Sequence, residues 1–160
     1  MSDTQLSKPF MYDTILIPTD GGPTASRVAS HVADLAERVD AAVHVLSVAD
    51  TRNRFKGPTG GVGVAAWEEA QRDRAERAVA ETAATLPESV AVTQCIESGV
   101  PATAIIEYAD AAEVDLIVMG THGRTGVDHY MIGSIAERIV RTASVPVLTV
   151  GVSDAEKESS

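Results

Sequence analysis

Two short segments of the sequence combine glycines with polar side chains, and each directly follows an apolar run. The first is Pro18-Thr19-Asp20-Gly21-Gly22, and the second is Gly120-Thr121-His122-Gly123-Arg124, which continues to Gly133-Ser134. Glycines let a backbone approach a phosphate closely and adopt positive φ. A helix that begins at Ser134 adds a hydroxyl and the free N–H groups of its first turn, which bind anions together with the helix dipole. The second segment is therefore predicted to hold a phosphate group.

Three side chains in these segments are suited to contact a ligand, and each has a structural alternative. Asp20 could bind a ribose or a metal-bound water, or it could cap the turn that follows it. His122 could contact a phosphate or assist a slow hydrolysis, or it could simply pack within its loop. Arg124 could pair with a phosphate through two hydrogen bonds, or with a nearby carboxylate. The four histidines show no metal-ligand spacing, so no protein metal site is predicted. No Ser/His/Asp triad is legible, so no catalytic residue is predicted.

The elements that must position these segments alternate between strand and helix patterns. Apolar runs typical of strands cover residues 14–18, 42–49, 90–96, 115–119 and 146–150, and apolar residues recur at helical spacing between them. This alternation predicts an α/β fold, a single doubly wound five-stranded parallel sheet in the order 3-2-1-4-5 with helices on both faces. Ligands bind such sheets at the switch point, beyond the carboxyl ends of the strands. Both polar segments begin there, after the first and fourth strands.

The remaining parts of the chain are assigned by composition. The domain is predicted over residues 12–152, between a flexible leader at 1–11 and a polar tail at 153–160. Residues 51–64 contain several glycines and a proline, which predicts a mobile loop before a long helix that ends at Pro87. A turn is expected at residues 98–100. Cys95 is the one cysteine of the chain, and it is predicted to be a buried structural thiol in a reducing compartment.

Charge and hydropathy restrict the partners. The formal net charge is −10 and aromatic residues make up 4% of the chain, whereas nucleic acids and anionic membranes attract basic surfaces. No apolar stretch reaches the length of a transmembrane helix, and residues 1–12 lack the apolar core of a signal peptide. A cytoplasmic protein is therefore expected. The acidity fits either a salt-rich cytoplasm or ordinary acidic solubility.

The order and spacing of the motifs resemble the universal stress protein family. The pattern Gly120-x2-Gly123-x9-Gly133-Ser134 is similar to the ATP-binding signature of that family. Further similarity lies in residues 13–20, 43–48, 99–102, 136–141 and 146–148, so that the resemblance extends from about residue 12 to residue 150. One departure is Gly22, followed by Pro23, where the family often has a serine. A contact from that hydroxyl is not expected here.

The resemblance implies an adenine nucleotide, ATP or else ADP or AMP, with Mg²⁺ or Mn²⁺ bridging its phosphates. By the same resemblance, Pro18, Thr19 and Asp20 would line the nucleoside end of the pocket, and Val48 would contact the adenine. Met119 and Gly120 would approach the ribose. The phosphates would be held by His122, Gly123, Gly133, Ser134 and Ile135. The resemblance also implies a homodimer formed through the strand at residues 146–150.

Three functions remain open at this point. The first is an ATP-binding stress-response or regulatory protein. The second is a slow ATPase or an autophosphorylating enzyme. The third is an interaction protein whose pocket is vestigial.

Overall fold

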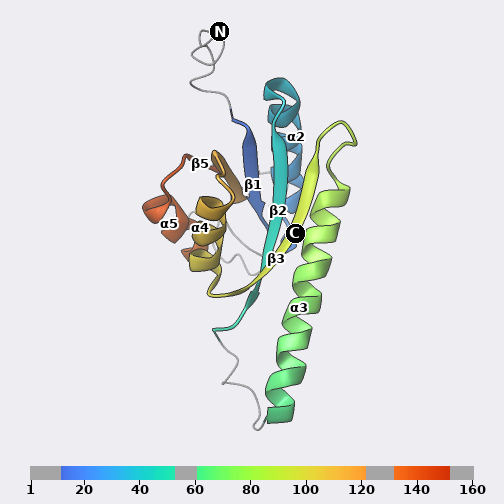
Figure 1. Ribbon diagram of the computed structural model, residues 1–160, viewed down its shortest axis with the longest axis vertical. Helices are drawn as coiled ribbons and strands as arrows, with labels where there is room; N and C mark the ends of the chain where they lie inside the picture. Colours follow the sequence, from blue (N-terminus) through green and yellow to red (C-terminus); the bar gives the residue numbers. More distant parts are fainter. Residues whose placement is uncertain (1–11, 53–60, 122–131, 152–160) are drawn as a thin grey trace.

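Five parallel strands form one sheet in the computed structural model, which describes residues 12–52, 61–121 and 132–151 (Figure 1). The strands are β1 (Thr14–Pro18), β2 (Ala42–Asp50), β3 (Val92–Gly99), β4 (Leu116–Gly120) and β5 (Val147–Val150). The helices are α2 (Ala25–Val39), α3 (Gly61–Ala84), α4 (Pro101–Ala111) and α5 (Ser134–Thr142). The strand order is β3-β2-β1-β4-β5, which confirms the predicted fold class.

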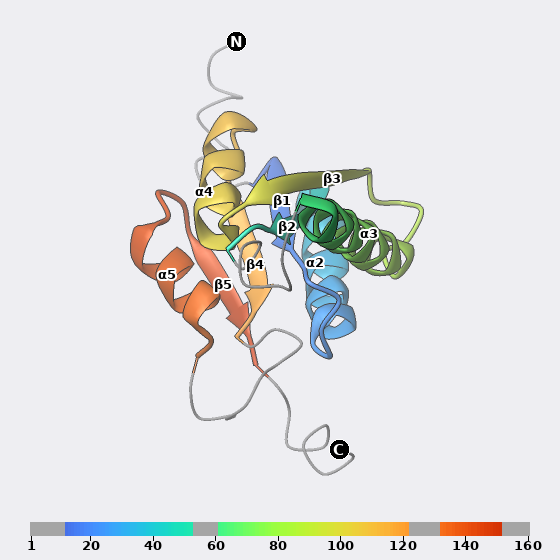
Figure 2. The ribbon, with the colours of Figure 1, turned by 90° about the horizontal axis from the view of Figure 1, so that it is seen from below.

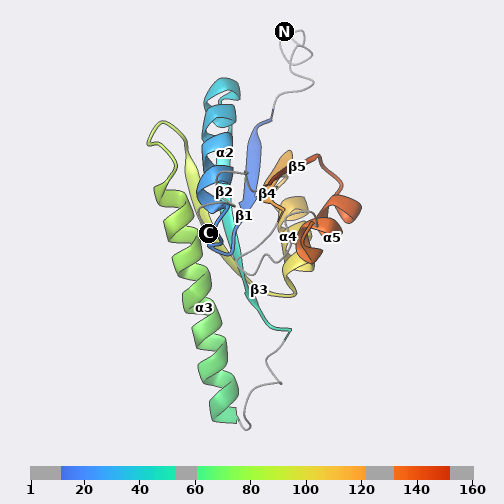
Figure 3. The ribbon, with the colours of Figure 1, turned by 180° about the vertical axis from the view of Figure 1, so that it is seen from behind.

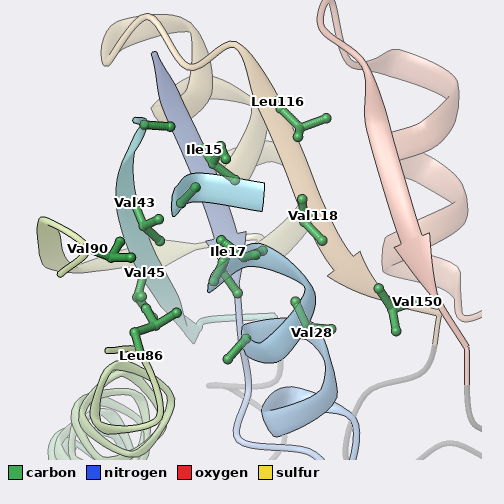
Figure 4. Packing of buried hydrophobic residues seen from close by; sticks show 14 of the residues in the cluster. Ile15, Ile17, Val28, Val43, Val45, Leu86, Val90, Leu116, Val118 and Val150 are labelled. Carbon is green, nitrogen blue, oxygen red and sulfur yellow. The ribbon is translucent and has the colours of Figure 1, made fainter. Parts of the chain in front are cut away.

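Helices cover both faces of this sheet, so the central strands are apolar on both sides. Figure 2 shows α2 and α3 on one side and α4 and α5 on the other. Ile15 and Ile17 of β1 point into the first core beside Val28 of α2 (Figure 4), whereas Leu16 points into the second. Val32 of α2 belongs to the first core as well. All five of these side chains are buried. Alternate residues of a strand face opposite layers, so β1 contributes to both cores.

The strand β3 runs further than the sequence predicts. Its predicted limits were residues 90–96, with a turn at 98–100, but the strand covers Val92–Gly99 and pairs with β2 along its length. The pairing ends with Asp50 opposite Gly99, whose φ of +143° is open to glycine. The apolar pattern used to predict the strand ends before the polar residues Glu97 and Ser98. An edge strand can contain such residues, because it exposes side chains that a central strand would bury.

The helix α3 also differs from the predicted limits. It begins at Gly61, so the last four residues of the predicted 51–64 loop belong to a helix rather than to a loop. Glycines lower helix propensity but do not forbid a helix, and residues further along α3 pack on the sheet. Figures 1 and 3 show that α3 starts beyond the carboxyl ends of the strands and runs back beside β2 and β3. Its first turns therefore extend past the sheet.

Cys95 is only half-buried, so its prediction as a buried thiol was wrong. Its sulfur lies 2.8 Å from the hydroxyl of Tyr108 on α4, and the same hydroxyl lies 2.7 Å from Nδ1 of His44 on β2. Cys95 stands on the edge strand β3, where no further strand covers it. Burial, followed by the contact with Cys95, raises the pKa of Tyr108, so the phenol keeps its proton for these hydrogen bonds.

The stability of the fold is expected to fall below pH 6.5 in a way that depends on His44. Burial lowers the pKa of His44 below its ordinary value of 6.5. Between the folded and the unfolded pKa the unfolded chain binds more protons, so the free energy of unfolding decreases as the pH falls through this window. Thermal unfolding from pH 7.5 to 5.5 should show a steeper loss of Tm for the wild type than for His44→Gln. Equal slopes for the two proteins would contradict this role.

In the described part of the chain, no helix combines the length and the apolar character needed to span a bilayer.

Candidate functional site

A cavity of about 690 Å³ opens at the carboxyl ends of β1, β2 and β4. Pockets for small molecules commonly have volumes of roughly 300–1,000 Å³. Its wall is formed by the loop after β1, the ends of β2 and β4, the first turns of α2, α4 and α5, and the middle of α3. It therefore lies at the predicted switch point, between the first and fourth strands in sequence order.

The loop after β1 is held by its own polar atoms. The backbone N–H of Thr19 donates to the carbonyl of Leu46 at 2.8 Å, and the N–H of Gly21 donates to Thr19 Oγ1 at 3.1 Å. Thr19 Oγ1 also lies 3.0 Å from Oγ1 of Thr82, which is buried on α3. The Thr19 hydroxyl therefore ties the loop to α3, a positioning role that the sequence did not indicate.

Asp20 and Gly21 complete the turn of this loop. The carboxylate of Asp20 accepts a hydrogen bond from the N–H of Gly22 at 2.9 Å, which matches the capping alternative considered for this residue. Gly21 has a φ of +75°, and a side chain there would lie against Ala78 of α3. Both residues therefore stabilise the turn, and Asp20 also borders the cavity.

The opposite wall of the cavity is the N-terminus of α5. The N–H of Gly133 donates to the carbonyl of Thr121 at 2.6 Å, and the helical hydrogen bonds begin where Glu137 donates to Gly133. Between them, the N–H groups of Ser134, Ile135 and Ala136 donate to no described residue. These three residues line the cavity, and unpaired N–H groups at a helix N-terminus favour an anion.

The structure brings together nine of the twelve residues that the sequence analysis singled out. Those lining the cavity are Pro18, Thr19, Asp20, Val48, Met119, Gly120, Gly133, Ser134 and Ile135. The other three, His122, Gly123 and Arg124, lie outside the described residues.

An ion pair at the end of β2 was missed by the sequence analysis. Nε of Arg52 donates to both carboxylate oxygens of Asp50, at 3.0 and 3.1 Å, and Nη2 donates to Oδ2 at 2.6 Å. Burial by itself raises the pKa of Asp50, but the hydrogen bonds and the charge of Arg52 lower it overall, and hydrogen bonding to Asp50 raises the pKa of Arg52. Both residues line the cavity and are charged at neutral pH. The available signal was the place of Asp50, directly after a predicted strand at the edge where ligands bind.

The middle of α3 also forms part of the wall. Gln71, Arg74 and Ala75 border the cavity, although the sequence analysis gave no ligand role to this helix. Its polar residues follow the pattern of a solvated helix face, and sequence alone does not indicate that such a face ends against a pocket.

No group of three or more histidine, cysteine, aspartate or glutamate side chains is placed to hold a metal ion anywhere in residues 12–52, 61–121 and 132–151. Around the cavity, the carboxylate of Asp50 is paired with Arg52, and that of Asp20 caps its own turn. A divalent cation that enters with a ligand would take most of its oxygen ligands from that ligand and from water.

Sequence comparison relates this chain to proteins of one family. The model of the universal stress protein family matches residues 11–151. The universal stress protein MJ0531 of Methanocaldococcus jannaschii is 35% identical over 144 residues, which cover 88% of this chain and 82% of that protein.

Solved structures show the same relationship. The structure of protein MJ0577 of Methanocaldococcus jannaschii has a TM-score of 0.74 at 29% identity and covers 90% of this chain and 99% of its own. A universal stress protein of Archaeoglobus fulgidus, solved in complex with dAMP, has a TM-score of 0.62 at 18% identity and covers 88% and 98% of the two chains, a likeness in fold. The chain described here belongs to the universal stress protein family.

Proposed function

We propose that the cavity binds ATP or a related adenine nucleotide, and that the protein acts as a nucleotide-binding regulator in a stress response. The observation that carries this proposal is the set of three N–H groups at Ser134, Ile135 and Ala136, which donate to no described residue and belong to the lining of a cavity large enough for a nucleotide. The net charge of −10 repels a phosphate at long range, so binding must rest on such local donors. The complex of a structural neighbour with dAMP supports the same ligand class.

In this proposal the phosphates lie at the N-terminus of α5, and the nucleoside lies along the ends of β1 and β2. Gly133 borders the phosphate end, where backbone must approach the ligand closely, and Gly120 borders the place of the ribose. Mg²⁺ or Mn²⁺ would bind mainly to phosphate oxygens, since the two described carboxylates of the cavity wall are already engaged, Asp50 with Arg52 and Asp20 with the N–H of Gly22. The proposal includes a cytoplasmic location, because ATP is available in the cytoplasm and a chain with a single cysteine needs no internal disulfide.

Two measurements on the purified protein test the proposal. Denaturing protein prepared without added ligand and identifying any released small molecule by mass spectrometry shows whether a nucleotide is retained. Calorimetric titration with ATP, ADP and AMP then gives the affinities, and a thermal shift should accompany binding. No binding of any of the three would reject the proposal and favour a vestigial pocket. Release of inorganic phosphate from bound ATP would favour a slow ATPase instead.

We also propose that the chain forms a homodimer through β5. This strand is an edge of the sheet, Leu148 on it is 45% exposed, and Val140 on the neighbouring helix α5 is 51% exposed. An exposed apolar edge strand favours pairing with another strand. We expect Leu148→Lys to sediment as a monomer at concentrations where the wild type is a dimer. Exposed Val100 at the start of α4 offers the control Val100→Lys, which should leave the dimer intact. A monomeric wild type would contradict the proposal.

A further inference from the structure

We propose that Arg52 binds the base of the nucleotide, with its planar guanidinium stacked on the purine ring. This inference rests on the proposed function, because it assigns a base-recognition residue to the same cavity. Arg52 does not belong to the sequence motifs that predict the phosphate site. The fold places it in the cavity wall, together with Asp50.

The hydrogen bonds of Arg52 hold its guanidinium in one orientation. The Nε and Nη2 side of the group is fully engaged by the carboxylate of Asp50, and Asp50 Oδ1 also accepts the backbone N–H of Arg52 at 2.9 Å. Nη1 donates to no described residue, and 46% of the Arg52 side chain is exposed. A guanidinium fixed in this way loses little further freedom when a flat ring packs on it.

The charges around Arg52 favour a base over a phosphate. The carboxylate of Asp50 balances the guanidinium, so the pair as a whole is neutral, and a phosphate brought to it would meet Asp50 as well as Arg52. The guanidinium face is weakly hydrated and stacks on aromatic rings. A neutral aromatic base therefore suits this place better than an anion does.

The distance across the sheet also assigns Arg52 to the base. The N–H groups proposed to bind the phosphates belong to α5, and Gly133 before this helix is hydrogen-bonded to Thr121 after β4, whereas Arg52 follows β2. The strand β1 lies between β4 and β2, so the two places are two strand spacings apart, about 10 Å. A nucleotide with its phosphates at α5 extends its base across β1 to the end of β2, where Val48 and Asp50 line the same wall.

Calorimetric titrations of Arg52 variants with ATP and with inorganic tripolyphosphate test this assignment. Arg52→Ala should weaken ATP binding by about five- to tenfold, the size of a planar guanidinium stacked on an aromatic ring, and should leave tripolyphosphate binding unchanged. Arg52→Lys keeps the charge but loses the plane, so it should weaken ATP binding nearly as much. The matched control is Arg38→Ala on α2, which removes an exposed arginine paired with Asp34 and should change neither affinity.

Three results would overturn the inference. One is ATP binding by Arg52→Ala that equals the wild type, and another is a loss of tripolyphosphate affinity that equals the loss for ATP. Full recovery of ATP affinity in Arg52→Lys would also overturn it, because it would show that charge alone matters. A wild-type protein that binds tripolyphosphate but not ATP would reject the proposed nucleotide function itself, which distinguishes the two failures.

Discussion

Replacing Ser134 with aspartate is expected to abolish nucleotide binding without harming the fold. Ser134 is the first residue of α5, and the adjoining N–H groups donate to no described residue. A carboxylate there occupies the place of the phosphate, and two like charges 4 Å apart near a protein surface repel by about 4 kcal/mol. The affinity for ATP should fall by more than about 100-fold. The same carboxylate interacts favourably with the helix dipole, by about 0.3–1 kcal/mol, so Tm should stay equal or rise.

Calorimetric titration and thermal unfolding of the same preparations measure both effects. Ser30→Asp is the charge-matched control, since Ser30 is exposed on α2 and does not line the cavity. It should keep the wild-type affinity. Ser134→Ala removes only the hydroxyl and should weaken binding by about 10- to 100-fold, the size of one hydrogen bond to a charged group. Undiminished ATP binding by Ser134→Asp would mean that the phosphates lie elsewhere.

Replacing Ile139 with alanine should lower the free energy of unfolding by about 2–5 kcal/mol. Ile139 lies on the inner face of α5 and is completely buried in the core formed with α4 and the sheet. Removing its outer carbons loses their transfer free energy and leaves a cavity. The ATP affinity should decrease as well, because Ile139 and Ala136 hold α5 against the sheet and so fix the N-terminus that faces the ligand.

Urea denaturation gives the free energy of unfolding of the variant, and calorimetric titration gives its affinity for ATP. Exposed Val100 provides the comparison, since Val100→Ala should change the free energy of unfolding by about 0.5 kcal/mol or less. A value as small as this for Ile139→Ala would show that α5 does not depend on its buried face.

The class of fold was predictable because two local patterns alternate along the chain, and the rule of right-handed crossovers left few strand orders. Apolar runs such as residues 14–18 are too short for helices and are followed by apolar residues at helical spacing, so a parallel sheet with crossover helices is the arrangement that buries both. The short, fully apolar β4 was predicted to within one residue, since 115–119 was expected and Leu116–Gly120 is observed. The longer and more polar β3 was not, because pairing with β2, rather than its own composition, sets its end at Gly99.

The candidate site also has a part that the sequence predicts and a part that it does not. Glycines and Ser134 signal the phosphate end in the sequence, because backbone N–H groups need small residues and a helix start, and both leave a local pattern. Arg52 and Arg74 leave no such pattern, since charged residues in a loop or on a helix usually face solvent. Thr82 leaves no local pattern either, although it is buried on α3 and contacts Thr19, which lies 63 residues earlier in the chain.

By itself, the sequence determined the class of fold, the strand order, the family and the segment suited to an anion. The fold class and the anion-binding segment follow from residue types at short separations, where periodicity, glycine and helix starts act locally. The strand order follows from the rules for crossover connections, and the family from the order of the motifs along the chain. Only the tertiary structure decided which side chains share the cavity and what holds them there. The ends of β2 and β3, the contact of Thr19 with α3 and the pairing of Asp50 with Arg52 beside the cavity depend on contacts between distant segments, which no local pattern records.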